Sequence, residues 1–388
     1  MDTSGSDYLK QLDSLLASGK QSWLFGAGIS LDANIPLMRP LTIRVFKMAE
    51  GKPEKDLLDA VQSELPETAH IEHILSHIGD YATIAERSKI DEVKIAGFTF
   101  SLDFLHDSHA KILQSIAETI RWGYRPKTDH EDERVGTLTE SLVTVDGHTN
   151  FVKALLGRGQ AGLAERRPPV RLFSTNYDTL LEDALALGCF PYWDGFSGGA
   201  VAFRSHRYGQ KEPETACRAH VIKLHGSIDW QLGDDGKVWR VRDHDCYPTR
   251  SGPVLIYPQS TKYLAAQRDP FAAQYDLFRR AVSEAGENVL AICGYSFGDE
   301  HINQEIELAV QHPENKTTVL AFSSTVSGVL EEWRKSHWGK RLYVASKVGL
   351  YVGTEGPFHS PEDGKALDWW TFAGVTKLLN NGAGGCIA

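Results

Sequence analysis

The chain has 388 residues, of which 41% are hydrophobic and 24% are charged, a composition typical of a globular protein with one large domain or two ordinary ones. No apolar run approaches the ~20 residues that cross a bilayer, so we expect no membrane association. The formal net charge of −10 does not favour contact with a phosphate backbone, so we expect no direct nucleic-acid binding.

The N-terminus, MDTSGSDYLKQLDSLLASGK, lacks the basic start and apolar stretch of a signal peptide, which predicts a cytoplasmic location. The cysteines are scattered and form no CxxC pair: Cys189, Cys217, Cys246, Cys293 and Cys386. Their spacing argues against a disulfide framework and against a structural zinc site.

Residues 7–19 are predicted to form an amphipathic opening helix, and the apolar run Trp23–Phe25 predicts a short buried strand. The glycine-rich turn GAGIS follows at residues 26–30. Bare backbone lets a ligand approach closely, and a strand, a glycine turn and a helix start can place a phosphate at a helix N-terminus. The full G-x-G-x-x-G pattern is absent because Leu31 stands at the third glycine position, so a tight turn without a ligand is the alternative.

Apolar residues recur at helical spacing between residues 52 and 140, as in Ile71, Ile74, Leu75 and Ile78. We therefore predict three parts: residues 1–51 with the opening helix and the first strand–glycine turn, a helical insertion over 52–140, and the remaining αβ scaffold over 141–388. The small-residue tail NNGAGGCIA is expected to be disordered.

From about residue 142 apolar strands alternate with helical patterns. VRLFSTNYDTLLEDALALG and ENVLAICGYSFGDEHINQEIELAV each predict a strand, a polar turn and a helix. AHVIKLHGSIDW predicts a strand that ends in a polar turn, GPVLIYPQS an edge segment, and TTVLAFSS and RLYVASKVGLYV one strand each. This rhythm predicts an α/β fold of the Rossmann type, with a doubly wound, mostly parallel sheet.

Polar clusters follow four of these strands, at residues 26–30, 174–178, 225–229 and 294–299. In a parallel sheet the carboxyl ends of the strands meet at one rim, where ligands bind. Each cluster also has a structural interpretation. Asn176 and Asp178 are preferred helix caps, His225 could be a turn histidine, and Asp299 suits a helix N-terminus. Their joint occurrence favours a functional site.

In chain order, GAGIS followed by IP, then STNYD, KLHGS and GYSFGDEHIN resemble the sirtuin superfamily, most closely the sirtuin-like (SIR2-like) branch of bacterial antiphage defence systems. The resemblance covers about residues 20–50 and 145–330. It implies a sirtuin-like Rossmann domain that binds NAD⁺ and breaks its nicotinamide–ribose bond.

The resemblance also implies residue roles. Asn176 and Asp178 match the polar pair beside the nicotinamide ribose, and His225 matches the catalytic histidine. The residues that match the cofactor-binding turns are Gly26, Ala27, Gly28, Ser30, Ser174, Thr175, Gly294, Tyr295 and Ser296, the last three on the adenosine side. Asn34 stands where the family often has glycine.

Two departures separate this sequence from protein-deacylating sirtuins. Those enzymes carry two cysteine pairs that bind zinc, whereas only Cys246 and Cys293 fall between His225 and the later turn, so no four-thiolate site and no metal are expected. The segment that would hold an acyl-lysine peptide reads VLIYPQSTKY instead. We therefore predict a zinc-less NAD⁺ hydrolase that releases nicotinamide and ADP-ribose.

The residue types suit that reaction. Histidine titrates near neutral pH and can act as the base, Asn176 can orient water and ribose through its amide, and Asp178 can support developing positive charge. The resemblance implies NAD⁺ depletion during phage infection, restrained by homo-oligomerisation or by a partner such as a HerA-like motor ATPase or another sensor protein. The alternatives are an NAD⁺-dependent protein deacylase and a non-catalytic module that binds NAD⁺ or ADP-ribose in a defence complex.

Overall fold

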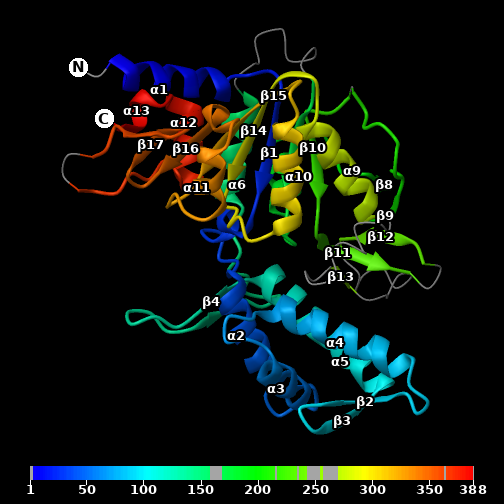
Figure 1. The fold of residues 1–388 in the computed structure, drawn as a ribbon. Helices are drawn as coiled ribbons and strands as arrows, with labels where there is room; N and C mark the ends of the chain where they lie inside the picture. The colour runs from blue at the N-terminus through cyan, green and yellow to red at the C-terminus, as the bar shows by residue number, and fades with distance from the viewer. Residues whose placement is uncertain are drawn as a thin grey trace.

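The computed structural model describes residues 3–157, 168–214, 216–233, 236–242, 254–256, 270–361 and 364–387. The strands of its main sheet are β1 (Gln21–Phe25), β6 (Val170–Ser174), β7 (Tyr192–Trp193), β10 (Ala219–Lys223), β14 (Gly286–Cys293), β15 (Asn315–Phe322), β16 (Leu342–Ser346), β17 (Gly349–Val352) and β18 (Glu355–Phe358). Within the described residues they form nine strands in the order β18-β17-β16-β15-β14-β1-β6-β10-β7 (Figure 1). All neighbours from β16 to β7 are parallel. This arrangement confirms the predicted Rossmann-type sheet.

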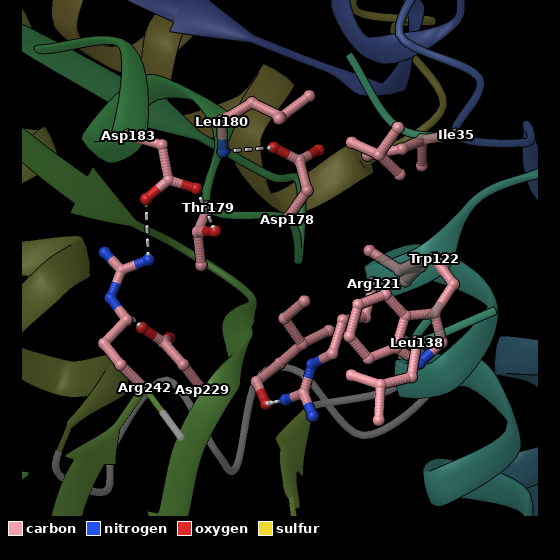
Figure 2. A pocket seen from close by; sticks show the side chains of 13 residues that line it. Ile35, Arg121, Trp122, Leu138, Asp178, Thr179, Leu180, Asp183, Asp229 and Arg242 are labelled. Carbon is pink, nitrogen blue, oxygen red and sulfur yellow. Dashed lines mark hydrogen bonds and ion pairs between the residues drawn. The ribbon is translucent and has the colours of Figure 1, made fainter. Parts of the chain in front are cut away.

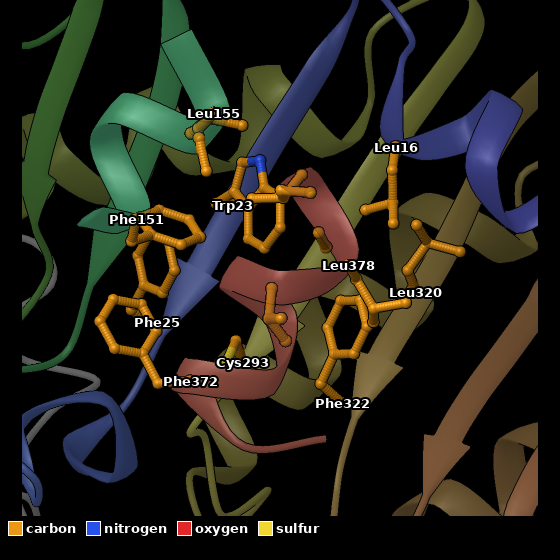
Figure 3. Close-up of a cluster of buried hydrophobic side chains, with 14 of the residues drawn as sticks. Leu16, Trp23, Phe25, Phe151, Leu155, Cys293, Leu320, Phe322, Phe372 and Leu378 are labelled. Atoms are coloured by element: carbon orange, nitrogen blue, oxygen red, sulfur yellow. The ribbon is translucent and has the colours of Figure 1, made fainter. Parts of the chain in front are cut away.

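Helices cover both faces of the sheet. One face carries α1 (Thr3–Leu16), α6 (Asp146–Gly157), α7 (Leu180–Leu187) and α12 (Phe372–Asn381), and the other carries α9 (Phe271–Val282), α10 (Glu300–Gln311) and α11 (Val329–Lys335). Side chains alternate across β1. Trp23 and Phe25 pack in the core on the first of these faces, and Leu24 packs in the core on the opposite face. Figure 3 shows Trp23 and Phe25 beside Phe151 of α6, with Phe372 of α12 next to Phe25. The sheet is therefore doubly wound.

A helical module lies beyond one end of the sheet (Figure 1). It contains α2 (Met38–Ala49), α3 (Glu54–Glu64), α4 (Ile71–Glu86) and α5 (Leu102–Trp122), the hairpin β2 (Glu92–Ile95) and β3 (Phe98–Ser101), and the short pair β4 (Tyr124–Arg125) and β5 (Arg134–Val135). Its helices share a core that includes Leu41, Leu57, Ile74 and Ile112. The boundaries at residues 51 and 140 stay predictions.

A second, antiparallel sheet was not predicted. It is built from β8 (Phe196–Gly198), β9 (Val201–Arg204), β11 (Gly226–Leu232), β12 (Val238–Val241) and β13 (Val254–Ile256), in the order β13-β11-β12-β9-β8. The prediction of a polar turn over residues 225–229 is therefore wrong beyond its first residue. The chain passes from β10 through Leu224 and His225 directly into β11.

Two further expectations are corrected near the C-terminus. RLYVASKVGLYV forms the antiparallel hairpin of β16 and β17 rather than one strand. The tail expected to be disordered is helical over most of its described length, because α12 extends to Asn381 and the short α13 spans Gly384–Ile387.

Two features of the sequence analysis lie outside the described residues. They are Cys246 and the part of VLIYPQSTKY that follows Ile256. None of the helices seen in the described ranges is long and apolar enough to cross a membrane.

Candidate active site

The ends of four parallel strands are aligned in register. Phe25, the last residue of β1, pairs with Cys293 of β14 on one side and with Ser174 of β6 on the other. Ser174 in turn pairs with Lys223, the last residue of β10. The four predicted polar clusters therefore begin at the same level of one rim.

The glycine turn packs directly against the turn after β14. The Gly28 amide donates to the Gly294 carbonyl oxygen at 2.9 Å. A Cβ atom on Gly26 would lie 2.6 Å from that same oxygen, and one on Gly294, whose φ is +67°, would lie 2.5 Å from the Ile29 nitrogen. The bare backbone thus has a packing reason of its own, beside any role toward a ligand.

Ser30, Asn176 and Asp178 form a buried cluster. The Ser30 hydroxyl donates to Asp178 Oδ2 at 2.8 Å, and Asn176 Nδ2 donates to Ser30 Oγ at 3.1 Å. Asp178 Oδ1 also accepts from the Leu180 amide at 3.1 Å, at the first residue of α7, although the N-cap position of that helix is Thr179. Asp178 therefore supports the start of α7 from one position before the cap and also belongs to the buried cluster.

The side-chain oxygen of Asn176 is an unsatisfied acceptor. Asn176 is 7% exposed, and its Oδ1 has no hydrogen-bond partner among the described residues. The turn around it is otherwise held, since its own amide donates to Ser174 Oγ at 3.0 Å and the Thr175 amide donates to the Phe25 carbonyl at 3.0 Å. A buried acceptor of this kind requires a partner such as water or a ligand.

His225 is buried beside an acidic partner. Its Nε2 lies 3.0 Å from Asp299 Oδ2, and both side chains are at most 5% exposed. Asp299 Oδ1 also accepts from the His301 amide at 3.2 Å, which caps α10. The helix-start interpretation of Asp299 therefore holds, but sequence reasoning missed the pairing, which joins the ends of β10 and β14.

Tyr295 and Ser296 point in different directions. The Tyr295 side chain is buried, and its hydroxyl donates to the Asp299 carbonyl at 3.1 Å. Burial raises the pKa of Tyr295 strongly. Ser296 is exposed, and its hydroxyl accepts from the Gly298 amide at 3.3 Å. Only Ser296 of the two presents its side chain to solvent.

A cavity of about 420 Å³ lies beside Asp178 (Figure 2). Arg121 and Trp122 reach it from α5, and Asp183, Asp229 and Arg242 line the opposite side. Arg242 lies 3.0 Å from Asp183 Oδ1 and 3.1 Å from Asp229 Oδ2, whereas Arg121 donates to the Ile228 carbonyl at 3.3 Å. Sequence reasoning assigned no role to either arginine, and no local motif marks them.

His148 of α6 is a second feature that sequence reasoning missed. It is 1% exposed, and neither ring nitrogen has a partner in the part of the chain that the structure describes. It lines a smaller cavity of about 260 Å³ with Phe372 and Thr376. Burial lowers the pKa of His148, and the nearby charge of Asp178 opposes that shift.

The described ranges contain no group of three or more His, Cys, Asp or Glu side chains that could hold a metal ion.

A family model described as the SIR2-like domain matches residues 170–339. Among solved structures, a Sir2 homolog in complex with NAD has a TM-score of 0.37 and 15% sequence identity, over 81% of this chain and 83% of that chain. No curated protein matches. Residues 170–339, which carry Asn176, Asp178, His225 and Asp299, are thus similar to the SIR2-like domain family.

Proposed function

We propose that this protein is an NAD⁺ hydrolase, which cleaves the nicotinamide–ribose bond to give nicotinamide and ADP-ribose. The observation that carries the proposal is the buried Ser30–Asn176–Asp178 cluster, whose Asn176 oxygen lacks a partner among the described residues, at the rim where His225 follows the adjacent strand. The match of residues 170–339, which include Asn176, Asp178 and His225, to the SIR2-like domain supports NAD⁺ as the ligand.

The reaction adds water across one C–N bond. The water oxygen bonds to C1′ of the ribose, and the electron pair of the broken bond returns to the nicotinamide ring nitrogen and removes its positive charge. One water proton passes to His225. Asp299, 3.0 Å from Nε2, would hold a proton on that nitrogen, so Nδ1 would be the basic one.

The cavity beside Asp178 has the character of a site for the pyridinium ring. Trp122, Ile35 and Leu138 give it an apolar wall. Its remaining wall contains three carboxylates and two guanidinium groups, an excess of negative charge that suits a cationic ring. Asp178 belongs both to this cavity and to the Asn176 cluster. A pyridinium ring in the cavity would therefore bring the nicotinamide–ribose bond close to that cluster.

The biological role that we propose is antiphage defence by NAD⁺ depletion. A reaction that destroys an essential nucleotide must be restrained, and the resemblance of the sequence to SIR2-like defence proteins supports control by homo-oligomerisation or by a partner such as a HerA-like motor ATPase. Purification from the native host, followed by identification of the proteins that remain bound, tests this role. A chain that stays monomeric, unaccompanied and fully active would contradict it.

Nicotinamide release from NAD⁺ by the purified protein tests the activity, with and without an acylated peptide. We expect release that needs no peptide. Nicotinamide that forms only with the peptide would support the deacylase instead, and binding of NAD⁺ without release would support the non-catalytic module.

Asn176→Ala and Asp178→Asn locate the site. We expect Asn176→Ala to abolish turnover while NAD⁺ binding persists, because the glycine turn remains. A role in helix stability alone predicts a loss of about 0.5–2 kcal/mol with normal turnover. Asp178→Asn keeps an oxygen that can accept from the Leu180 amide, so its effect on turnover reports the negative charge and the bond from Ser30 rather than the support of α7.

A further inference from the structure

Lys223 is a buried cation directly beside the proposed site. It is the last residue of β10, two positions before His225, and its side chain is 3% exposed. Its register partner is Ser174, where the Asn176–Asp178 turn begins, and the following amide, that of Leu224, donates to the Ser174 carbonyl at 2.8 Å. Lysine is almost never fully buried unless it is paired, so this position needs an explanation.

The Lys223 ammonium has two partners on the segment after β6. Its Nζ donates to the main-chain carbonyl oxygen of Asp178, and it lies 3.8 Å from Oε1 of Glu182 in the first turn of α7. The Glu182 side chain is 6% exposed. Burial raises the pKa of Glu182 to about 7, and the charges of Lys223 and Arg242 oppose that shift.

Stability alone does not account for this pair. Desolvation of two charges cancels much of their attraction, and well-packed apolar residues often replace a buried ion pair without loss. An apolar pair cannot, however, donate to the Asp178 carbonyl. Asp178 is held by Ser30 and Leu180 through its carboxylate and by Lys223 through its main chain, so the three contacts together fix the residue.

We propose that Lys223 is a positioning residue, which holds the Asn176–Asp178 turn in its reactive geometry through the Asp178 carbonyl, while Glu182 is a second, more distant polar neighbour of its ammonium. The effect on turnover rests on the proposed NAD⁺ hydrolase function. The stabilisation of the Asn176–Asp178 turn by Lys223 is a property of the free protein, so it can be measured without any substrate.

Lys223→Met combined with Glu182→Leu separates positioning from stability. The single Lys223→Met variant should be destabilised, because Glu182 is left without its cation. The double variant should recover most of that stability, because neither charge remains. Its turnover should stay roughly 10- to 100-fold below wild type, since small displacements of reacting groups cost that much. Amide hydrogen exchange over residues 175–180 should accelerate by a similar factor.

Two further variants serve as controls. Asn288 lies near the start of β14, at the end of the strand opposite the site, and its buried side-chain amide donates to the Ala281 carbonyl. Asn288→Leu should therefore lower stability without changing exchange over residues 175–180. Glu182→Gln keeps the Lys223 contact with Asp178 and should leave exchange in the turn close to wild type. If the Met/Leu variant does not fold, Lys223→Met with Glu182→Gln takes its place, because it also removes the donor to the Asp178 carbonyl.

The outcomes are distinct. Wild-type exchange in the turn of the double variant would overturn the positioning role, whatever happens to turnover. Faster exchange in that variant, together with a wild-type protein that releases no nicotinamide, would uphold the positioning role and refute the hydrolase. Faster exchange with unchanged turnover would show that the turn does not set the rate and would also overturn the proposal.

Discussion

Gly26 lies where two turns touch, and its missing side chain has a measurable consequence. A Cβ atom there would be 2.6 Å from both the Gly294 oxygen and the Tyr295 Cα, and neither backbone atom can move aside easily. We expect Gly26→Ala to lower the free energy of unfolding by about 1–3 kcal/mol, the usual cost of overpacking. Urea denaturation measures this. Gly19→Ala is the matched control, because nothing lies within 4 Å of its Cβ position, and equal midpoints for the two variants would contradict the prediction.

Asp299 combines a helix cap with the pairing to His225, and one substitution separates these roles. Asp299→Asn keeps an oxygen that can accept from the His301 amide but removes the negative charge near Nε2. We expect turnover to fall by ~10²–10⁴-fold, the range for loss of acid–base function, with little change in thermal stability. Glu300→Gln changes an exposed neighbouring carboxylate and should have no effect. Normal turnover in Asp299→Asn would mean that the pairing is structural.

At the scale of elements, apolar runs predicted the parallel strands because helices cover both faces of the sheet. The same criterion failed for β11, whose sequence GSIDWQL contains Asp229 and Gln231 although both are buried. The charge of Asp229 is balanced by Arg242, which follows β12. A buried charge with a distant partner resembles an exposed turn when the sequence is read alone.

The candidate site was predictable only where a motif marks it. The expectation that the four clusters begin at one rim agrees with the strand register, whereas the roles of Asn176, Asp178 and His225 stay predictions. Lys223 and Arg121 carry no local signal of function. Lys223 reads as the polar end of a strand and Arg121 as a favourable charge in the last turn of α5, and only the tertiary contacts reveal more.

The C-terminal helix α12 is part of the main core, and its last two residues, Asn380 and Asn381, belong to the tail that was expected to be disordered. The Phe372 ring lies 4.9 Å from that of Phe151 and 6.5 Å from that of Phe25, measured between centroids. We expect Phe372→Ala to cost about 3–5 kcal/mol of unfolding free energy, as for other buried aromatic truncations. Leu187→Ala at an exposed helix end should change it by less than about 0.5 kcal/mol. Urea denaturation of both variants checks this, and a comparably small effect in Phe372→Ala would mean that α12 does not belong to the core.

For the whole molecule, the cavity beside Asp178 joins three parts of the fold. Its walls come from α5 of the helical module, from the turn after β6, and from Asp229 of β11 and Arg242, which directly follows β12 (Figure 2). The Tyr177 hydroxyl donates to Glu72 of α4, which ties the site turn to the helical module from another side. The geometry of the proposed site therefore depends on how these parts pack, not on the main sheet alone.

The pH dependence of global stability reflects two opposing contributions, one from two histidines and one from Glu182. Burial lowers the pKa of His109 and of His220 to about 4, so the unfolded chain binds more protons than the folded one below about pH 6.5, and stability falls as pH drops from there toward 4. Glu182, which faces Lys223, Arg242, Asp229 and Tyr192, behaves in the opposite way. Its pKa is raised to about 7, so the folded chain retains a proton that the unfolded chain releases, and this contribution grows as pH falls from about 7 to 4.5.

Glu182→Gln isolates the second of these contributions. The variant cannot gain the stabilising proton, so its unfolding free energy should decline more steeply than that of wild type between pH 7 and pH 4.5. Below pH 4.5 the two curves should run parallel, because Glu182 is then protonated in both the folded and the unfolded wild-type chain. Urea denaturation at half-unit pH steps measures both curves. Parallel curves over the whole range would mean that Glu182 stays ionised in the folded protein at neutral pH and that Lys223 holds it as a permanent ion pair.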